Sequence, residues 1–166
     1  VGNFKAAMQL LRSEGLDKAI KEKAIEGVPI LGICLGQQLL MECSEENELT
    51  NGLGLIPGKV KYFYNDKLFD NSKVPNIGWR PILKNIQSER SWNDSILKGV
   101  SHNDQCYFVH SLCVKTKSIE HALSLSNYGG VSFASTAQYK NIFGCQFHPE
   151  NSGSVGLKIL KNFIKI

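Results

Sequence analysis

The sequence lacks any hydrophobic run long enough to cross a lipid bilayer. Its longest apolar stretch, around VPILGICLG at residues 28–36, is far shorter than the roughly 20 apolar residues that a membrane-spanning helix needs. This stretch is therefore interpreted as part of a folded interior and not as a transmembrane segment.

Long runs of one charge sign are also missing. The 19 basic and 15 acidic residues give a net charge of +4 and are spread along the chain. A protein that follows a phosphate backbone concentrates its basic residues on one segment or face. We therefore do not expect nucleic-acid binding, although single lysines can face an acidic partner or a phosphorylated small molecule.

Cysteine pairs of the CxxC type are absent as well. The chain has five cysteines, an odd number, and their separations do not match the spacing of zinc ligands. We expect free thiols and no metal site, as in a reduced cytoplasmic protein. The cysteines are Cys34, Cys43, Cys106, Cys113 and Cys145.

The length and composition fit one folded unit. With 166 residues, 42% of them hydrophobic and 20% charged, the chain is large enough to bury a core of its own. It contains no internal repeat and no low-complexity linker. We expect a single domain over residues 1–166.

The N-terminal part of the chain shows helical and strand patterns in turn. Apolar residues recur at helical spacing over residues 4–25, with Asn3 as a candidate N-cap and Gly15 as a candidate interruption. VPILGI at 28–33 is typical of a strand buried on both faces. LGQQLLMEC at 35–43 is interpreted as a helix.

The middle of the chain is rich in β-forming residues between Gly, Asn, Asp and Pro breaks. Strands are predicted at 58–63, 73–79, 107–114, 131–138 and 142–147. A closing helix is predicted from Ser152, with an inward face made by Val155, Ile159, Leu160, Phe163 and Ile164.

This order of elements predicts an α/β fold, with a central, mostly parallel sheet, helices on both faces and an antiparallel strand insertion. In such sheets the functional residues gather at the carboxyl ends of the strands. Cys34 follows one buried strand and His148 follows another.

Cys34 lies in the stretch GICLG, at the junction of a predicted strand and a predicted helix. Gly32 and Gly36 let the strand and the helix approach each other closely, which lifts the thiol clear of the sheet. The free N–H groups of a helix N-terminus favour the thiolate. The alternative for this residue is a buried structural cysteine.

The stretch QFHPE at 146–150 supplies a base and a carboxylate. Because proline disfavours the helical conformation of the residue before it, His148 should be extended. Glu150 then points to the same side and can orient the imidazole, as the third member of a catalytic triad does. The alternative is a polar turn after a strand.

Together these motifs resemble those of the class I glutamine amidotransferases. The residues PILGICLGQQLL and QFHPE resemble the family as a whole, while VPNIGW and YFVHS resemble its histidine-biosynthesis branch, the glutaminase subunits of imidazole glycerol phosphate synthases. The similarity covers essentially the whole chain. It implies a flavodoxin-like fold, and it implies that the domain is N-terminally incomplete here, because family members carry further strands before VGNF.

The resemblance assigns roles by position. Cys34 would be the nucleophile, His148 the general base and acid, and Glu150 its orienting carboxylate. Glutamine binding would involve Gly2, Leu35, Gln38, Glu46 and Ser111, with the Leu35 N–H and the segment around Gly2 as oxyanion donors. The partner interface would include Asn76, Trp79, Tyr107 and Asn151.

The implied reaction is hydrolysis of glutamine to glutamate and ammonia through a glutamyl thioester. The implied partner is a cyclase subunit with a (β/α)₈ barrel fold, which forms a heterodimer and receives ammonia through a dry passage. It then makes imidazole glycerol phosphate and aminoimidazole carboxamide ribotide. No cofactor is implied.

Three residues depart from the family pattern: Asn76 stands in place of histidine, Leu112 in place of tyrosine and Asn151 in place of lysine. Because of these departures, one alternative is the same glutaminase reaction supplying ammonia to a sugar amidotransferase of surface polysaccharide assembly. A stand-alone thiol hydrolase of γ-glutamyl compounds is another alternative. A non-catalytic regulatory scaffold is a third, against which the intact triad residues argue. His110 is expected to be a hydrogen-bonded strand residue and not a second base.

Overall fold

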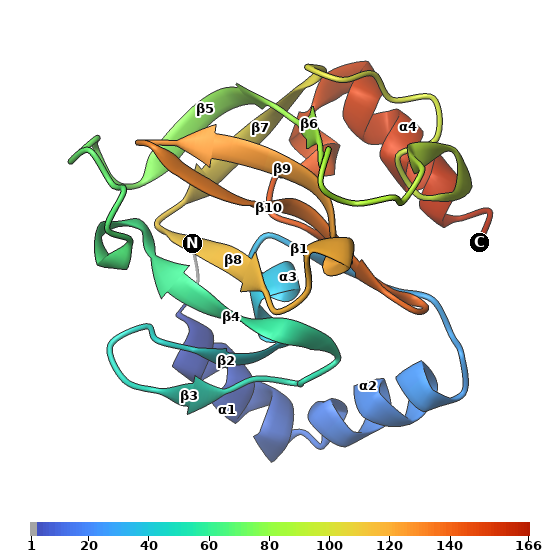
Figure 1. Ribbon diagram of the computed structural model, residues 1–166. Coiled ribbons are helices and arrows are strands. Elements are labelled where there is room, and N and C mark those ends of the chain that lie inside the picture. Colours follow the sequence, from blue (N-terminus) through green and yellow to red (C-terminus); the bar gives the residue numbers. More distant parts are fainter. Residues whose placement is uncertain (1–2) are drawn as a thin grey trace.

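The computed structural model describes residues 3–166 (Figure 1). Its α-helices are α1 (Phe4–Ser13), α2 (Leu16–Ile25), α3 (Leu35–Leu39) and α4 (Gly153–Phe163). Its strands are β1 (Ile30–Ile33), β2 (Met41–Ser44), β3 (Thr50–Asn51), β4 (Ile56–Tyr62), β5 (Asn76–Pro81), β6 (Leu83–Lys84), β7 (Gln105–His110), β8 (Leu112–Thr116), β9 (Ala122–Tyr128), β10 (Val131–Tyr139) and β11 (Ile142–Cys145). Short 3₁₀ helices lie at η1 (Phe63–Asn65), η2 (Trp92–Asp94), η3 (Ile119–His121) and η4 (Pro149–Asn151).

The first two helices confirm the predicted interruption at Gly15. This residue has φ 70°, a left-handed conformation that glycine adopts without steric cost. The predicted N-cap is also confirmed, because the Asn3 side chain accepts a hydrogen bond of 2.9 Å from the Ala6 N–H.

The strands form three sheets. A five-stranded sheet has the order β1-β11-β10-β9-β6, a four-stranded sheet has the order β3-β2-β4-β8, and β5 pairs with β7 as a two-stranded ribbon. Figure 1 shows β1 and α3 in the middle of the molecule, with α4 and the pair α1 and α2 at opposite ends of the view.

The prediction of an α/β fold is confirmed, but the expected mostly parallel sheet is not found among residues 3–166. Only β1 with β11 and β2 with β4 pair in parallel, and the other pairs are antiparallel. The cause is the short connections: Gly129 and Gly130 join β9 to β10, and Lys140 and Asn141 join β10 to β11. A parallel pair needs a longer crossover.

Three details of the predicted elements are wrong. The helix expected at 35–43 ends at Leu39, because the following residues pair with β4 as strand β2. The strand expected at 107–114 is broken at Ser111, and its halves β7 and β8 join different sheets. Ile164 lies beyond α4 and is 80% exposed.

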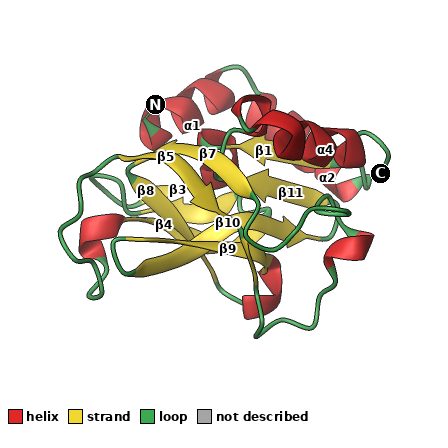
Figure 2. Cartoon of the chain, turned by 90° about the horizontal axis from the view of Figure 1, so that it is seen from above, coloured by secondary structure: helices red, strands yellow, loops and turns green. Residues whose placement is uncertain are grey.

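The core has two parts. One includes five buried phenylalanines and the inner side of α4; its largest fully buried members are Phe63, Phe108, Phe133 and Phe147. The other lies beneath α1 and includes Phe4, Met8, Met41, Ile56 and Val60. Figure 2 shows α1, α2 and α4 along one side of the strands, so that the helices cover apolar side chains of the sheets.

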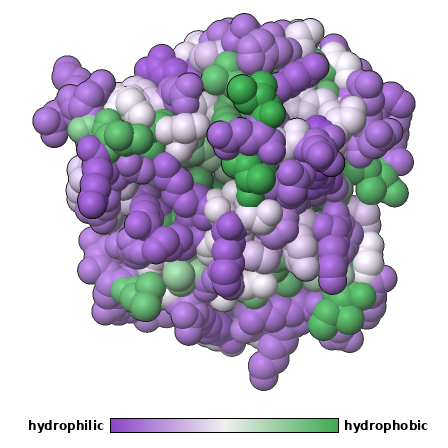
Figure 3. Space-filling view, in the orientation of Figure 1, coloured by the Kyte–Doolittle hydropathy of each residue, from purple (hydrophilic) through white to green (hydrophobic). Residues whose placement is uncertain are grey.

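The face of the molecule seen in the orientation of Figure 1 is mostly hydrophilic. In the face drawn in Figure 3, apolar side chains form small separate patches among polar ones. Within residues 3–166, none of the helices combines the length and the apolar character that a membrane span requires.

Candidate active site

Two neighbouring parallel strands bring the predicted catalytic segments to one end of the five-stranded sheet. β1 and β11 pair with Ile33 opposite Cys145, and the Cys34 N–H continues the ladder by donating to the Cys145 carbonyl at 2.7 Å. Cys34 and Gln146 are therefore the first residues beyond the two strand ends. His148 follows two residues later.

Strand β7 runs beside both segments. The Cys34 thiol donates to the Val109 carbonyl at 3.8 Å, and the His148 N–H donates to the Tyr107 carbonyl at 2.9 Å. Because Tyr107 and Val109 are two residues apart on one strand, their carbonyls point the same way. The structure thus holds Cys34 and His148 at neighbouring positions along β7.

The turn at Cys34 is as tight as the two glycines predict. Cys34 has φ 51° and ψ −108°, a conformation that costs a non-glycine residue free energy. A Cβ atom on Gly32 would lie 2.5 Å from the Gly36 carbonyl carbon. Strand β1 and helix α3 therefore approach each other more closely than any side chain at residue 32 allows.

The sulfur of Cys34 is nearly enclosed, with only 7% of the residue exposed. Burial raises the pKa of the Cys34 thiol, the charge of Glu150 raises it further, and a hydrogen bond from the Leu35 N–H opposes both. The Leu35 N–H at the start of α3 favours the thiolate, as expected, but the net shift of the Cys34 pKa is upward. Helix α3 has only five residues, and desolvation outweighs its N–H groups.

The other buried thiols are held in the neutral form more strongly. Burial raises the pKa of the Cys106 and Cys113 thiols to about 12. The Cys145 thiol is fully enclosed and its pKa is raised further still. All five cysteines are free, as predicted.

His148 and Glu150 form a pair by themselves. The backbone of His148 is extended, with φ −95° and ψ 97°, as the following proline predicts. Its Nδ1 lies 2.6 Å from Glu150 Oε1. The carboxylate can only accept a hydrogen bond, so Nδ1 carries a proton and the neutral ring has Nε2 as its acceptor.

Ser152 fixes the backbone of this second segment. Its hydroxyl donates to the His148 carbonyl at 2.6 Å and accepts from the Tyr107 N–H at 2.9 Å. Ser152 is buried, so these bonds tie the start of α4 to β7.

The residues predicted to bind glutamine have different surroundings. Gln38 is buried, and its Nε2 donates to the Leu112 carbonyl at 3.4 Å and to Gln146 Oε1 at 3.1 Å. Glu46 Oε2 accepts from the Phe4 N–H at 2.7 Å, at the start of α1. Ser111 lies at the break between β7 and β8, and Leu35 is the first residue of α3. Gly2 lies outside the described residues.

Of the residues predicted to face a partner, Trp79 is 50% exposed, and its ring packs edge-on against Tyr107 with centroids 6.0 Å apart. Asn151 is also exposed. Asn76 is fully buried, so the prediction that it faces a partner is wrong. The register of the ribbon turns Asn76 toward His110 on the inner side. Ile77, to which no sequence motif pointed, is 54% exposed on the outer side of the same strand.

His110 is a hydrogen-bonded strand histidine, as predicted. Its Nδ1 donates to the Leu112 carbonyl at 2.7 Å, and its Nε2 accepts from Asn76 Nδ2 at 3.0 Å. Burial lowers the pKa of His110 to about 4. The imidazole is therefore neutral at physiological pH.

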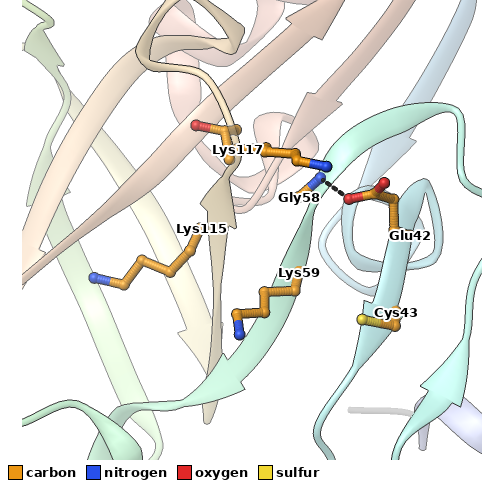
Figure 4. A pocket seen from close by; sticks show the side chains of 7 residues that line it. Glu42, Cys43, Gly58, Lys59, Lys115 and Lys117 are labelled. Atoms are coloured by element: carbon orange, nitrogen blue, oxygen red, sulfur yellow. Dashed lines mark hydrogen bonds between the residues drawn. The ribbon is translucent and has the colours of Figure 1, made fainter.

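A hollow of about 290 Å³ lies on the four-stranded sheet and contains none of the predicted site residues. Figure 4 shows three lysines and Glu42 around it, with the Glu42 carboxylate accepting from the Gly58 N–H at 3.0 Å. Lys59 pairs with Glu45 and Lys115 pairs with Asp66, each at 3.0 Å. These carboxylates neutralise two of the lysines, which weakens the hollow as an anion site.

Comparisons with known proteins agree with the motifs. The family model for glutamine amidotransferase class-I matches residues 9–166. The chain is 47% identical over 165 residues to the imidazole glycerol phosphate synthase subunit HisH of Methanosarcina barkeri, covering 99% of this chain and 75% of that protein. It is 40% identical over 169 residues to the subunit HisH 1 of Campylobacter jejuni, covering 100% of this chain and 78% of that protein.

Solved structures share the fold. A crystal structure of a glutamine amidotransferase superposes with a TM-score of 0.65 at 12% identity, covering 99% of this chain and 74% of that one. A glutamine amidotransferase of Thermotoga maritima gives a TM-score of 0.57 at 18% identity, covering 99% of this chain and 57% of that one. These likenesses confirm the predicted fold class.

Proposed function

The chain belongs to the class I glutamine amidotransferases, and on that premise we propose that it is the glutaminase subunit of an imidazole glycerol phosphate synthase in histidine biosynthesis. It hydrolyses glutamine to glutamate and ammonia. The curated relatives from an archaeon and a bacterium carry that subunit's name, which favours this function over the sugar amidotransferase of polysaccharide assembly.

The observation that carries the assignment of the catalytic residues is the register of β1 against β11. It sets Cys34 beside the segment of Gln146 and His148, and the 2.6 Å contact with Glu150 orients the imidazole. A nucleophile, a base and an orienting carboxylate are the parts that acyl transfer through a thioester requires.

The reaction then proceeds in two steps. His148 Nε2 takes the proton of the Cys34 thiol, and the sulfur attacks the side-chain carbonyl carbon of glutamine. The carbon–nitrogen bond breaks, the same proton goes to the departing ammonia, and a glutamyl thioester remains. Water, deprotonated by His148, attacks the thioester and releases glutamate and the thiol.

Because the Cys34 thiol is buried, His148 is needed to remove its proton. Because desolvation raises the pKa of the Cys34 thiol, the sulfur is protonated at rest and becomes a nucleophile only when its proton is removed. The Leu35 N–H, which makes a hydrogen bond to the Cys34 sulfur, is proposed as an oxyanion donor. Removing one such donor typically costs on the order of a hundredfold in rate.

The proposed partner is a cyclase with a (β/α)₈ barrel fold, which receives the ammonia. The exposed outer side of the ribbon, with Ile77 and Trp79, lies on the strand that pairs with β7, next to the catalytic segments. Asn151 is exposed directly after Glu150. A partner seated there would cover the site, keep ammonia away from bulk water and form a heterodimer. Five free thiols support a location in the reducing cytoplasm.

The test is glutamate release from glutamine, measured on the protein alone and then with a candidate cyclase and its nucleotide ligand. We expect strong stimulation by the partner and its loss in Cys34→Ala. Cys43→Ala is the matched control, because Cys43 lies on β2 and outside the proposed triad, and it should stay active.

The alternatives give different results. High activity without any effect of the partner would identify a stand-alone thiol hydrolase. No activity under any condition, with a folded protein, would identify a non-catalytic scaffold.

A further inference from the structure

Gln146 is a fully buried glutamine whose role in the proposed reaction is unassigned. It is the first residue after β11, and its N–H donates to the Ser135 carbonyl at 2.9 Å, which fixes its backbone. Its side-chain Nε2 donates to the Cys34 sulfur at 3.8 Å, and its Oε1 accepts from Gln38 Nε2 at 3.1 Å. Both ends of this amide are therefore engaged.

The orientation of the Gln146 amide follows from its neighbours. Gln38 Nε2 also donates to the Leu112 carbonyl at 3.4 Å. A carbonyl can only accept, so Gln38 must turn its nitrogen toward both acceptors. Gln146 then has to offer Oε1 to Gln38, which leaves its N–H groups for the sulfur.

This arrangement continues away from the sulfur. The Leu112 carbonyl that holds Gln38 also accepts from His110 Nδ1 at 2.7 Å, and Asn76 Nδ2 donates to His110 Nε2 at 3.0 Å. All four side chains, Asn76, His110, Gln38 and Gln146, are buried. A buried network of this kind is rigid because each broken bond leaves a polar group without water.

The groups facing the sulfur act differently before and after the proton leaves. At rest the thiol donates to the Val109 carbonyl. A carbonyl oxygen cannot donate a hydrogen bond to a thiolate. Glu150, facing from η4, opposes the anion, and the Leu35 N–H favours it. Apart from the imidazolium that His148 becomes when it takes the proton, the Gln146 amide is the side-chain donor that the structure places against the sulfur.

We propose that Gln146 is a positioning residue for the nucleophile: its amide, clamped by Gln38, aims the Cys34 sulfur and supports it as a thiolate. The inference rests on the proposed function for what the sulfur attacks, but not for the contact itself. It also assigns the nitrogen of Gln38 to the clamp, in addition to the predicted role of Gln38 in binding glutamine.

The test is alkylation of Cys34 by iodoacetamide as a function of pH, followed by mass spectrometry of the Cys34 peptide. In Gln146→Met, which keeps the length of the side chain and removes the donor, we expect the midpoint to move upward by about one pH unit. That shift corresponds to roughly tenfold less thiolate at neutral pH, as expected for one lost hydrogen bond to a charged group. Where the wild-type protein releases glutamate, kcat should fall about tenfold at unchanged KM.

Gln37→Met is the matched control. Gln37 is also fully buried, lies on the same helix as Gln38 and donates to the Ala134 carbonyl at 3.0 Å, but makes no hydrogen bond with Cys34. It should leave the midpoint in place. Equal midpoints in Gln146→Met, Gln37→Met and the wild-type protein would overturn the inference.

A second variant covers the case in which Gln146→Met does not fold. Gln38→Met removes the clamp and keeps the Gln146 amide, and alkylation requires no bound glutamine. A smaller upward shift therefore supports the inference and an unchanged midpoint overturns it. The two proposals fail separately. A wild-type protein that never releases glutamate refutes the proposed function, while the alkylation series still decides the role of Gln146.

Discussion

The two strand ends that build the site are constructed in opposite ways. The turn after β1 is enclosed: the Cys34 backbone is strained, the sulfur is nearly buried, and its surroundings include Gly32, the Val109 carbonyl of β7 and the Gln146 side chain. The segment after β11 is more self-contained: two hydrogen bonds with Tyr107 anchor it to β7, but His148 is paired with Glu150 two residues away and Ser152 returns to the His148 carbonyl. The proposed nucleophile thus depends on several parts of the fold, whereas the proposed base is oriented largely by its own short segment.

The largest expected effect is on activity and comes from the self-contained segment. His148→Ala should lower glutamate release on the order of 10³-fold, because one side chain serves both proton transfers. The measurement is kcat under the conditions in which the wild-type protein is most active. His102→Ala, at an exposed turn, should retain activity, and a comparable loss there would break the assignment.

The next effect is on stability and comes from the enclosed turn. Gly32→Ala places a Cβ atom 2.5 Å from backbone at Gly36, and we expect a loss of about 3 kcal/mol in the free energy of unfolding, as for severe overpacking. Urea unfolding measures it. Gly36→Ala is the control, since its Cβ would meet nothing within 4 Å; equal losses in both variants would contradict the close approach of β1 and α3.

Acid should lower the free energy of unfolding through His110, which belongs to the buried network behind the Cys34 turn. Burial lowers the pKa of His110 from 6.5 to about 4, so the unfolded chain binds a proton at higher pH than the folded protein does. Stability is therefore complete above pH 6.5 and is lost as the pH falls toward 4. We expect this residue to contribute a loss of about 2 kcal/mol between pH 7 and pH 5.

Urea unfolding at the two pH values tests this contribution. His110→Gln should be less stable at pH 7 but should lose about 2 kcal/mol less than the wild-type protein on acidification. His148→Ala should keep the His110 contribution. If His110→Gln responds to acid as the wild-type protein does, the loss arises elsewhere.

The smallest expected effect is on stability and comes from Ser152, in the segment after β11. Ser152→Ala removes two partly buried hydrogen bonds and leaves the Tyr107 N–H without its partner. We expect a loss of about 1.5 kcal/mol in the free energy of unfolding. Ser154→Ala, at an exposed residue of α4, should change stability by less than about 0.5 kcal/mol, and an equal loss in both variants would contradict the role of Ser152.

The sequence analysis was most successful where local rules decide the structure. The extended conformation of His148 follows from Pro149, the tight turn at Cys34 from its glycines, and the helix break from Gly15. Those rules act within a few residues and need no knowledge of the rest of the chain. They led to the two segments that build the candidate site.

Predictions that depend on distant partners were less successful. The helix expected to continue past Leu39 ends there because β2 pairs with β4, and the break at Ser111 sends β7 and β8 to different sheets. Asn76 is turned inward by the register of the ribbon. The raised pKa of the Cys34 thiol reflects how completely the sulfur is enclosed. Pairing, register and burial are properties of the assembled structure.

The left-handed backbone at Cys34 affects which residues evolution would favour at this position. Glycine adopts that conformation without the steric cost that any other residue pays. A lineage relieved of its catalytic duty would gain stability by exchanging Cys34 for glycine, so drift would tend to erase the thiol. A cysteine kept in this conformation at a cost in stability therefore supports the proposed catalytic role of Cys34.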